Sequence, residues 1–320
     1  MQSANLVFTE NCHPNKRQRN GSTTQMKITK KSAAISFIAA LVSLELAVRA
    51  SGLTDFPLYD SNNKIGYIPK PSQSGSFLNK NSWEFNSLSM GAGPFIPTDG
   101  INTLLIGDSV VLGGNPYRQE DKLGPALQRE SKNTVWPISA GSWSLRNELI
   151  YLKAHPEVLS KVDNFIFILN SEDFQQASSW GCETTHPRSY PTSSALYVFK
   201  KYVYNFTPCK GIAPEMVVDN GDWKQEIKDF IANKYTQGKP VYFFLYPKKT
   251  EATDTSLSKS DLEVYAQYLK QENNHNIRVF SVARDPRWNL NFYRDEIHPT
   301  VEGTKILASI INSPKQDIEL

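Results

Sequence analysis

The chain has 320 residues, enough for one large domain or two small ones, and 39% of them are apolar, as in ordinary globular proteins. The formal net charge is +3, but residues 1–31 contain six basic side chains and a single acidic one. The rest of the chain is therefore slightly acidic, which gives no electrostatic reason to expect a nucleic-acid partner.

The N-terminal region has the pattern of a targeting segment. Three lysines within residues 27–31 precede an apolar run at residues 32–48, an order typical of a signal peptide or of a signal anchor. The run is shorter than the roughly 20 residues of a full span, and Glu45 interrupts it. Because Arg49 disfavours cleavage behind the run, we expect an uncleaved anchor over residues 32–50. A cleaved signal peptide and a soluble amphipathic helix are the alternatives.

Polar segments flank this expected anchor on both sides. Residues 1–31 are predicted to be cytoplasmic and disordered, since residues 1–25 show no periodicity; a true start at Met26 is the alternative interpretation. Residues 51–100 are rich in Ser, Asn, Pro and Gly, and we interpret them as a neck with short strands that pair on the body.

Cysteine usage fits an exported protein. Cys12 lies before the expected anchor, and Cys182 and Cys209 are the only cysteines after it. An oxidising compartment would join such a pair, so we predict a disulfide between them, with two unrelated thiols as the alternative. The spacing of the cysteines is not that of metal ligands, and no metal site is predicted.

After residue 100, short apolar runs alternate with helix-like stretches. Continuous apolar runs are typical of buried parallel strands, and their alternation with helices indicates right-handed βαβ units. We therefore predict an α/β three-layer sandwich over residues 101–314, with a five-stranded parallel sheet between helices. The expected strands are 102–106, 134–138, 164–169, 240–246 and 277–281, and the expected helices are 119–130, 144–155, 222–235, 258–273 and 301–312.

The interval between the third and fourth expected strands is too long for a simple crossover. Residues 175–221 within it have weak periodicity and many aromatic side chains, and we interpret them as an insertion. An insertion at the carboxyl end of a strand lies beside the ligand crevice of an open α/β sheet. We expect its aromatic side chains to pack a small core of their own, and stacking on sugar rings is the alternative.

The first expected strand stops at Gly107-Asp108-Ser109, which raises the question of a nucleophile. A serine hydroxyl needs a base within hydrogen-bond reach, and the base needs an acceptor that orients it. Of the five histidines, His298 is the best placed, because it lies between the last strand and the last helix with Asp295 three residues before it. A carboxylate at this spacing can accept from Nδ1–H and leave Nε2 facing outward.

These two motifs resemble those of the SGNH hydrolases, also called GDSL esterases and lipases. "GDS" ends the first strand, and "Asp-x-x-His" precedes the C-terminal helix. The resemblance covers roughly residues 100–312 and implies a five-stranded parallel sheet between helices, of the SGNH or flavodoxin-like type. It also implies that Ser109 is the nucleophile, His298 the base and Asp295 the orienting acid.

The same resemblance implies an oxyanion hole made by the backbone N–H of Ser109, a glycine N–H after the second strand and an asparagine side chain after the third. Gly141 matches the glycine. The family reads Gly-x-Asn-Asp at the third element, where this chain reads "NSED", so Glu172 stands at the family's asparagine. Asn170, on the same strand face, is the predicted substitute. We expect the following residues near the site: Asp108, Trp143, Glu172 and Asp173.

The stretches "LELAVRASGLTDFPLYD" and "GYIPKPSQSG" resemble membrane-anchored SGNH proteins of the bacterial cell envelope, which typically act on acyl groups of surface polysaccharide. This implies a protein of the inner membrane whose catalytic domain faces the periplasm or the exterior. We predict a serine esterase that removes small acyl groups, chiefly acetyl, from an envelope or extracellular polysaccharide. A polysaccharide O-acetyltransferase with the same triad and an inactive glycan-binding or assembly subunit are the alternatives.

No cofactor is predicted. A P-loop would need a second glycine where Leu112 stands, and the chain carries no dinucleotide fingerprint. The predicted partners are the acylated carbohydrate and the membrane. The sequence indicates no oligomeric state.

Overall fold

The structure is a computed structural model of the chain and describes residues 29–204, 209, 211–232, 235–253, 255–270, 275–314 and 316–320. The chain divides into two compact units, residues 1–43 and Leu44–Leu320. All the strands described and all the site residues discussed below lie in the second unit. The predictions for residues 1–28, Cys12 among them, fall outside the described residues.

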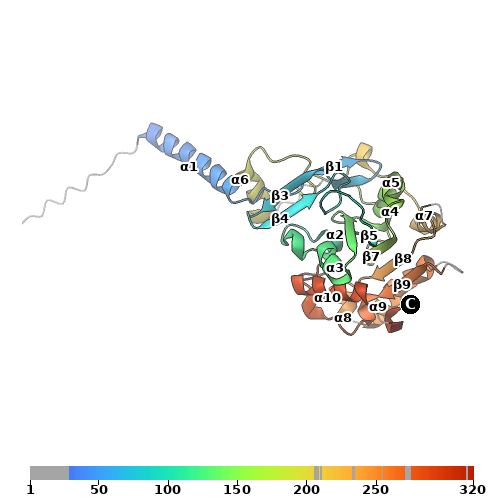
Figure 1. The fold of residues 1–320 in the computed structure, drawn as a ribbon. Coiled ribbons are helices and arrows are strands. Elements are labelled where there is room, and N and C mark those ends of the chain that lie inside the picture. The colour runs from blue at the N-terminus through green and yellow to red at the C-terminus, as the bar shows by residue number, and fades with distance from the viewer. Residues whose placement is uncertain are drawn as a thin grey trace, which may run out of the picture. The chain divides into compact units, whose positions relative to one another are not determined.

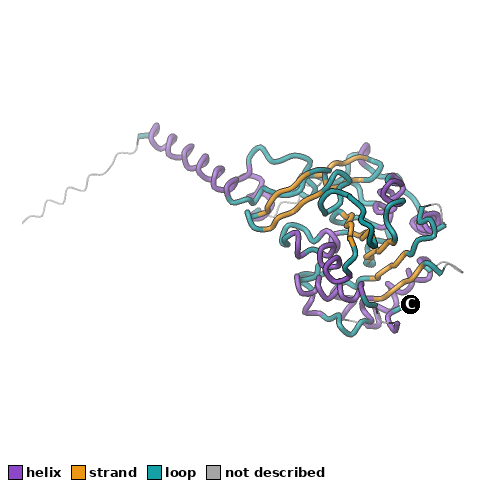
Figure 2. The backbone as a smooth tube through the Cα atoms, viewed as in Figure 1, coloured by secondary structure: helices purple, strands orange, loops and turns teal. Residues whose placement is uncertain are grey.

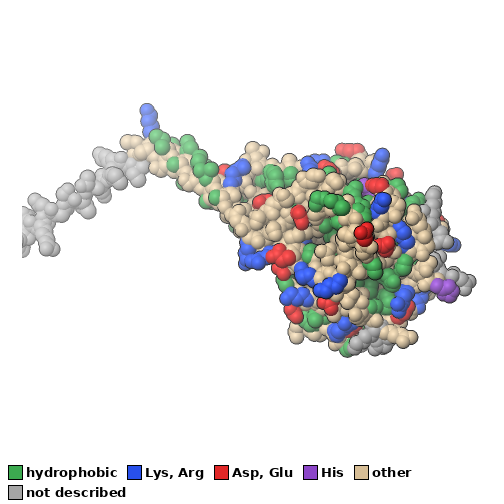
Figure 3. Space-filling view, in the orientation of Figure 1, with side chains coloured by type: hydrophobic (Ala, Val, Ile, Leu, Met, Phe, Trp, Pro, Cys, Tyr) green, Lys and Arg blue, Asp and Glu red, His purple; other side chains and the backbone are tan. Residues whose placement is uncertain are grey.

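One helix, α1 (Lys30–Ala50), contains the apolar run of the expected anchor. None of its residues is buried, and its exposed apolar side chains are green in Figure 3. By length and composition α1 is able to cross a membrane, a test that a signal sequence near an N-terminus also passes.

Five parallel strands form the central sheet, as predicted. Their order is β6-β5-β7-β8-β9, and Figure 1 labels β5, β7, β8 and β9. No bound differs from the expected one by more than a single residue. Pro137 lies in β6, an edge strand, where a missing N–H does not interrupt the sheet. The strands are β5 (Asn102–Gly107), β6 (Thr134–Ser139), β7 (Asn164–Leu169), β8 (Val241–Leu245) and β9 (Ile277–Ser281).

Helices cover both faces of this sheet, which confirms the three-layer sandwich. In β5, Leu104 and Ile106 pack into one buried cluster and Leu105 into the other, as the two-residue period of a strand requires. The first cluster includes side chains of α4 (Leu145–Ala154), α7 (Trp223–Ile231) and α9 (Thr255–Leu269), and the second includes those of α3 (Leu123–Ser131) and α10 (Val301–Asn312).

The helices confirm the predicted stretches with shifted ends. The stretch 119–130 is broken at Lys122, whose backbone is extended, into a short turn η1 (Gln119–Asp121) and α3. Pro125 lies in the first turn of α3, where proline is tolerated because the N–H has no helical partner. The other short elements are α5 (Pro156–Leu159), α8 (Lys249–Thr253), η4 (Val282–Arg284), η5 (Leu290–Phe292) and η6 (Gln316–Ile318).

Residues 51–100 contain two antiparallel hairpins, visible as paired strands in Figure 2. Tyr59 and Tyr67 of the first hairpin are buried in the same cluster as α4 and α7, so this segment contributes to the core. The hairpins are β1 (Tyr59–Asn62) with β2 (Gly66–Pro69) and β3 (Gln73–Phe77) with β4 (Asn81–Phe85).

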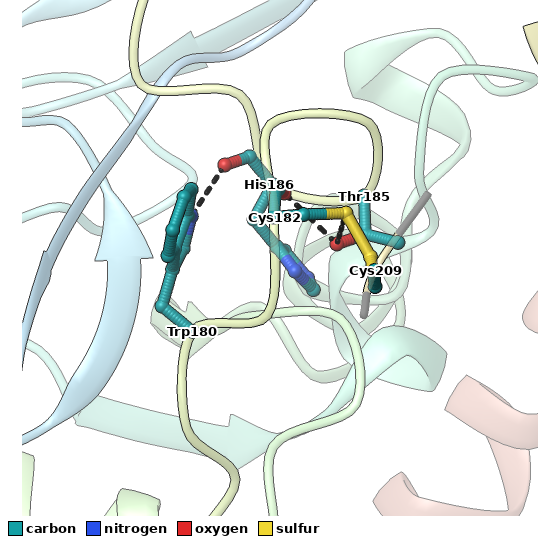
Figure 4. The surroundings of a disulfide bond; sticks show 5 residues. All are labelled: Trp180, Cys182, Thr185, His186 and Cys209. Atoms are coloured by element: carbon teal, nitrogen blue, oxygen red, sulfur yellow. Dashed lines mark hydrogen bonds between the residues drawn. A yellow bond between two sulfur atoms is a disulfide. The ribbon is translucent and has the colours of Figure 1, made fainter. Parts of the chain in front are cut away.

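The described part of the long segment between β7 and β8 contains three short elements and a disulfide ahead of α7. Cys182 and Cys209 are bonded to each other (Figure 4). Next to the bond, Trp180 donates its indole N–H to the carbonyl oxygen of His186 at 2.7 Å. The elements are α6 (Ser194–Val198), a π-helical turn η2 (Phe199–Val203) and η3 (Pro214–Met216).

Candidate active site

The candidate nucleophile lies where the strand β5 ends. After Gly107, Asp108 is the N-cap of the short helix α2 (Ser109–Leu112), and its carboxylate accepts from the Val110 N–H at 2.8 Å. This cap turns the chain sharply and places Ser109 at the carboxyl edge of the sheet. Gly107 is needed for the turn, since a Cβ there would lie 2.6 Å from the Val111 side chain.

The candidate base and its orienting carboxylate lie in the loop between β9 and α10. Asp295 accepts hydrogen bonds from the Nδ1 of His298 at 2.8 Å and from the backbone N–H of His298 at 2.8 Å. Arg294 donates to the second carboxylate oxygen at 3.1 Å. With Nδ1 donating, Nε2 is the ring nitrogen left to act on a neighbour.

Asp295 stays ionised in this loop. Partial burial raises the pKa of Asp295, but hydrogen bonds from the backbone of His298 and Ile297 and from the imidazole outweigh burial and lower the pKa to about 2. A carboxylate that is charged at neutral pH stabilises the imidazolium that forms when the ring takes a proton.

Ser109 and His298 line one cleft of about 440 Å³ at the carboxyl edge of the sheet. Side chains from the segments after β6 and β7 complete the lining, including Trp143, Glu172 and Asp173. Within these described segments, the Ser109 hydroxyl donates to Asp108 at 3.4 Å, and no hydrogen bond joins it to His298. Catalytic hydrogen bonds are often long or unformed before substrate binds, so the serine must turn from one partner to the other.

Asn170 ties the end of β7 to the nucleophile turn. It is buried, and its amide group donates to Asp108 at 3.2 Å and to Asp173 at 2.9 Å. The backbone N–H of Asn170 also donates to Asp173, at 2.7 Å. Burial raises the pKa of Asp108 and of Asp173, and the nearby His298 imidazole opposes the rise at Asp108. The amide group of Asn170 is therefore directed at two carboxylates that line the cleft.

The turn after β6, which carries Gly141, is held from outside the sheet. The Gly141 carbonyl accepts from the Tyr67 hydroxyl at 2.7 Å and lies 3.2 Å from Nε2 of His186. His186 stacks on Tyr67, and burial lowers the pKa of His186 to about 4, so the ring is neutral. Trp143 donates its indole N–H to the Tyr67 carbonyl at 2.7 Å. The cleft itself is lined by Ser142 rather than by Gly141.

Glu172 lies at the rim of the cleft and not inside it. Its side chain is 64% exposed, and it accepts from Lys248 Nζ at 3.0 Å. The neighbouring Asp173 is fully buried. After β7, Glu172 thus points outward and Asp173 inward. The buried carboxylate, Asp173, does not stand at the family's asparagine position.

Sequence reasoning missed two residues that hold the turn at Gly141, Tyr67 and His186, and one buried carboxylate, Glu148. Tyr67 and His186 come from the segments read as neck and insertion, where no periodicity marks them. Glu148 is fully buried in α4, and neither of its carboxylate oxygens has a hydrogen-bond partner among the described residues. Burial raises the pKa of Glu148 well above its ordinary value, and Asp108 adds to the rise. The sequence signal that could have indicated burial of Glu148 is its position in α4 between the apolar residues Leu145 and Leu149.

No protein-family model and no curated protein matches this sequence. Solved structures do. A protein of Desulfitobacterium hafniense described as a lipolytic protein of the G-D-S-L family is 15% identical, with 66% of this chain and 97% of that chain covered and a TM-score of 0.40.

Two further solved structures are similar to this chain. The C-terminal catalytic domain of peptidoglycan O-acetyltransferase A of Streptococcus pneumoniae is 15% identical, covering 66% of this chain and 90% of that one, with a TM-score of 0.37. An acetylxylan esterase of Geobacillus stearothermophilus is 14% identical, covering 68% and 95%, with a TM-score of 0.36. Similarities at this level do not determine the activity or the substrate of this chain.

Among the described residues, no group of three or more His, Cys, Asp and Glu side chains is arranged to hold a metal ion.

Proposed function

We propose that this protein is a serine esterase that removes small acyl groups, chiefly acetyl, from an envelope or extracellular polysaccharide. The observation that carries the proposal is the cleft in which Ser109 and His298 meet, with Asp295 bonded to the far side of the imidazole. Nucleophile, base and orienting acid are the three parts that covalent ester hydrolysis requires.

The reaction runs in two halves. Nε2 of His298 takes the hydroxyl proton as Ser109 Oγ attacks the acyl carbon, and His298 then gives the proton to the departing sugar oxygen. The acyl group is left on Ser109. A water molecule, activated by the same ring, attacks the acyl-serine and releases the acid and the free serine. Asp295 holds the ring in one tautomer throughout.

Charge on the acyl oxygen needs donors during both halves. The proposed donors are the backbone N–H groups of Ser109 and of the turn at Gly141 and Ser142. The carbonyl of Gly141 is held by Tyr67 and His186, which fixes the plane of the next peptide bond. Asn170 serves the hole from behind, because its amide protons are directed at Asp108 and Asp173.

The cleft lining favours a small acyl group on a sugar. Serine, glutamine and acidic side chains line the cleft, and Trp143 and Ile297 supply its apolar surface. Polar hydroxyl and carboxylate groups match the hydrogen-bonding of a carbohydrate better than a long alkyl chain. An open polar cleft also admits water, which favours hydrolysis over transfer of the acyl group to a second sugar.

The location in the cell is part of the proposal. The exposed apolar helix α1 would anchor the protein in the bacterial inner membrane, with the catalytic domain on the periplasmic or outer side. A disulfide between Cys182 and Cys209 agrees with an oxidising compartment.

Labelling of the full chain with a fluorophosphonate tests the proposal directly. We expect one modified residue, Ser109, identified by mass spectrometry, and no label on the Ser109→Ala variant. Ser178→Ala, a change at another serine that lines the same cleft, is the matched control and should label like the wild type. Label on another serine would overturn the assignment of Ser109, and absence of label would leave an inactive glycan-binding subunit.

A second measurement separates hydrolysis from transfer. The labelled serine should turn over an aryl acetate in water without any added sugar. Turnover that appears only when an acceptor oligosaccharide is supplied would instead identify an O-acetyltransferase with the same triad.

A further inference from the structure

The end of α1 is bound to the segment between β7 and β8 through a charged residue of the apolar helix. The Glu45 carboxylate accepts from the backbone N–H groups of Ser194 and Ala195 at 2.8 and 3.0 Å, and from the Ser193 hydroxyl at 2.9 Å. These are the first residues of α6 and its N-cap. Glu45 therefore caps α6 from another helix.

Arg49 completes this junction. It donates to Glu45 at 2.7 Å and to the Thr192 carbonyl at 2.8 Å. The charge that interrupts the apolar run is thus paired and hydrogen-bonded by the folded body. Glu45 lies five residues before the end of α1, about 8 Å along a helix that rises 1.5 Å per residue.

The segment held in this way presents apolar side chains to the outside. Leu196, Phe199 and Val203 are 51%, 50% and 69% exposed. Their spacing of three and four residues places them on one side of a helical segment. The opposite side is fixed to the body, since the ring of Tyr197 lies 5.2 Å from that of Phe56.

The composition of this outer side is that of a membrane interface. Tyr202 and Tyr204 are also exposed, and Lys200 stands between the apolar side chains. Aromatic and basic residues around an apolar strip are typical of helices that lie in the headgroup region of a bilayer. A set of large exposed apolar side chains in one short segment is unusual for a surface that faces only water.

We infer that residues 194–204 lie in the lipid headgroup region beside the anchor, and that they hold the catalytic domain against the membrane surface. The inference rests on the proposed anchor, and it adds a second point of attachment. Residues 32–44, which precede Glu45, rise only about 20 Å as a helix, less than the roughly 30 Å of a hydrocarbon core. With Glu45 bound to α6, the α6 segment must lie close to the lipid boundary.

Depth-dependent quenching on the full chain tests this. The background variant Cys12→Ser leaves no free cysteine, because Cys182 and Cys209 are bonded. Single variants Val203→Cys, Ile38→Cys and Ile96→Cys are labelled with an environment-sensitive fluorophore and reconstituted into vesicles of phosphatidylcholine and phosphatidylglycerol. Ile96 is the matched control, since it is 69% exposed like Val203 but lies outside α6 and η2.

We expect the Val203 label to shift to the blue and to be quenched by lipids that carry a nitroxide near the headgroup. The Ile38 label, inside the expected span, should be quenched by nitroxides deep in the acyl chains, and the Ile96 label by neither. A label at 203 that behaves like the one at 96, with Ile38 still quenched, overturns the inference and leaves the anchor intact.

Two other outcomes also overturn it. A blue-shifted Val203 label that no lipid nitroxide quenches would mean that this surface contacts a second copy of the chain. Absence of quenching at both 203 and 38 would remove the anchor, and with it the second attachment, without touching the chemistry of Ser109.

Discussion

Two carboxylates close to the cleft have opposite surroundings. Asp295 is 45% exposed and accepts from the imidazole, two backbone N–H groups and Arg294, and these hydrogen bonds outweigh burial and lower its pKa to about 2. Glu148 is fully buried without any hydrogen-bond partner among the described residues, and burial raises its pKa well above the ordinary value. Asp295 combines partial exposure with several hydrogen-bond donors, which lowers its pKa, whereas Glu148 is buried without a described donor, which raises its pKa.

The largest effect is expected when the nucleophile or the base that takes its proton is removed. Ser109→Ala and His298→Ala should each lower kcat by about 10⁵–10⁶, and the double variant should be hardly worse, because triad members act as a unit. Steady-state rates on an aryl acetate measure this. Additive losses would show that the two residues do not share a mechanism.

Asp295→Asn should lower kcat by about 10⁴, because the amide would hold the ring in the wrong tautomer. Glu148→Gln is the matched change at the other carboxylate and should keep activity close to that of the wild type. Folding of both variants is checked by circular dichroism. Equal losses for the two changes would contradict the distinction between a charged carboxylate and a neutral one.

The strands and the Asp295–His298 pair were predictable from the sequence. The five strands were predicted to within one residue because each is a short apolar run with an uninterrupted pattern. Asp295 and His298 were predicted as a bonded pair from a spacing of three, and the structure has that bond. Features that depend only on residues close in sequence can be predicted from the sequence.

Contacts between distant segments were not predictable. Nothing in the sequence around Tyr67 or His186 shows that both reach the carbonyl of Gly141. The hydrogen bonds of Asn170 to Asp108 depend on two strand ends meeting across the sheet, and period-two reasoning placed the residue without its partners. The roles of Ser109 and of the predicted oxyanion donors stay predictions until they are measured.

Asn170→Ala distinguishes a donor to the oxyanion from a support behind it. We expect the protein to lose about 1–3 kcal/mol of stability, because two buried carboxylates lose an amide donor, and kcat to fall by less than the about 10²–10³ that loss of a direct oxyanion donor costs. Urea denaturation and steady-state kinetics are measured on the same preparation. A rate loss with unchanged stability would show instead that the amide faces the reacting oxygen.

Glu148→Gln should change how stability depends on pH. An unfolded glutamate titrates near pH 4.3, and burial raises the folded pKa above that. The folded wild type then binds more protons than the unfolded chain, so its stability falls as pH rises from the unfolded value towards the folded one. The carboxylates that interact with Glu148 electrostatically are Asp108 and Asp173.

The Gln variant lacks this titration, so its stability relative to the wild type should increase from about pH 5 to about pH 8. Urea unfolding at the two pH values measures the difference. A relative stability that is the same at both pH values would mean that Glu148 carries the same charge in the folded and the unfolded chain, and that burial does not raise its pKa.

The smallest effect is expected at Glu172, the residue that replaces the family's asparagine. Its carboxylate is 64% exposed and paired with Lys248 at the rim, and exposed ion pairs contribute about 0–1 kcal/mol. Glu172→Gln should therefore leave kcat/KM within about twofold of the wild type and leave stability unchanged.

Asp173→Asn, one residue further on and fully buried, is the contrasting variant and should cost about 1–3 kcal/mol of stability. If Glu172→Gln instead raised the rate at neutral pH, the carboxylate would have to turn into the cleft during the reaction, since only a group facing the oxyanion can repel it.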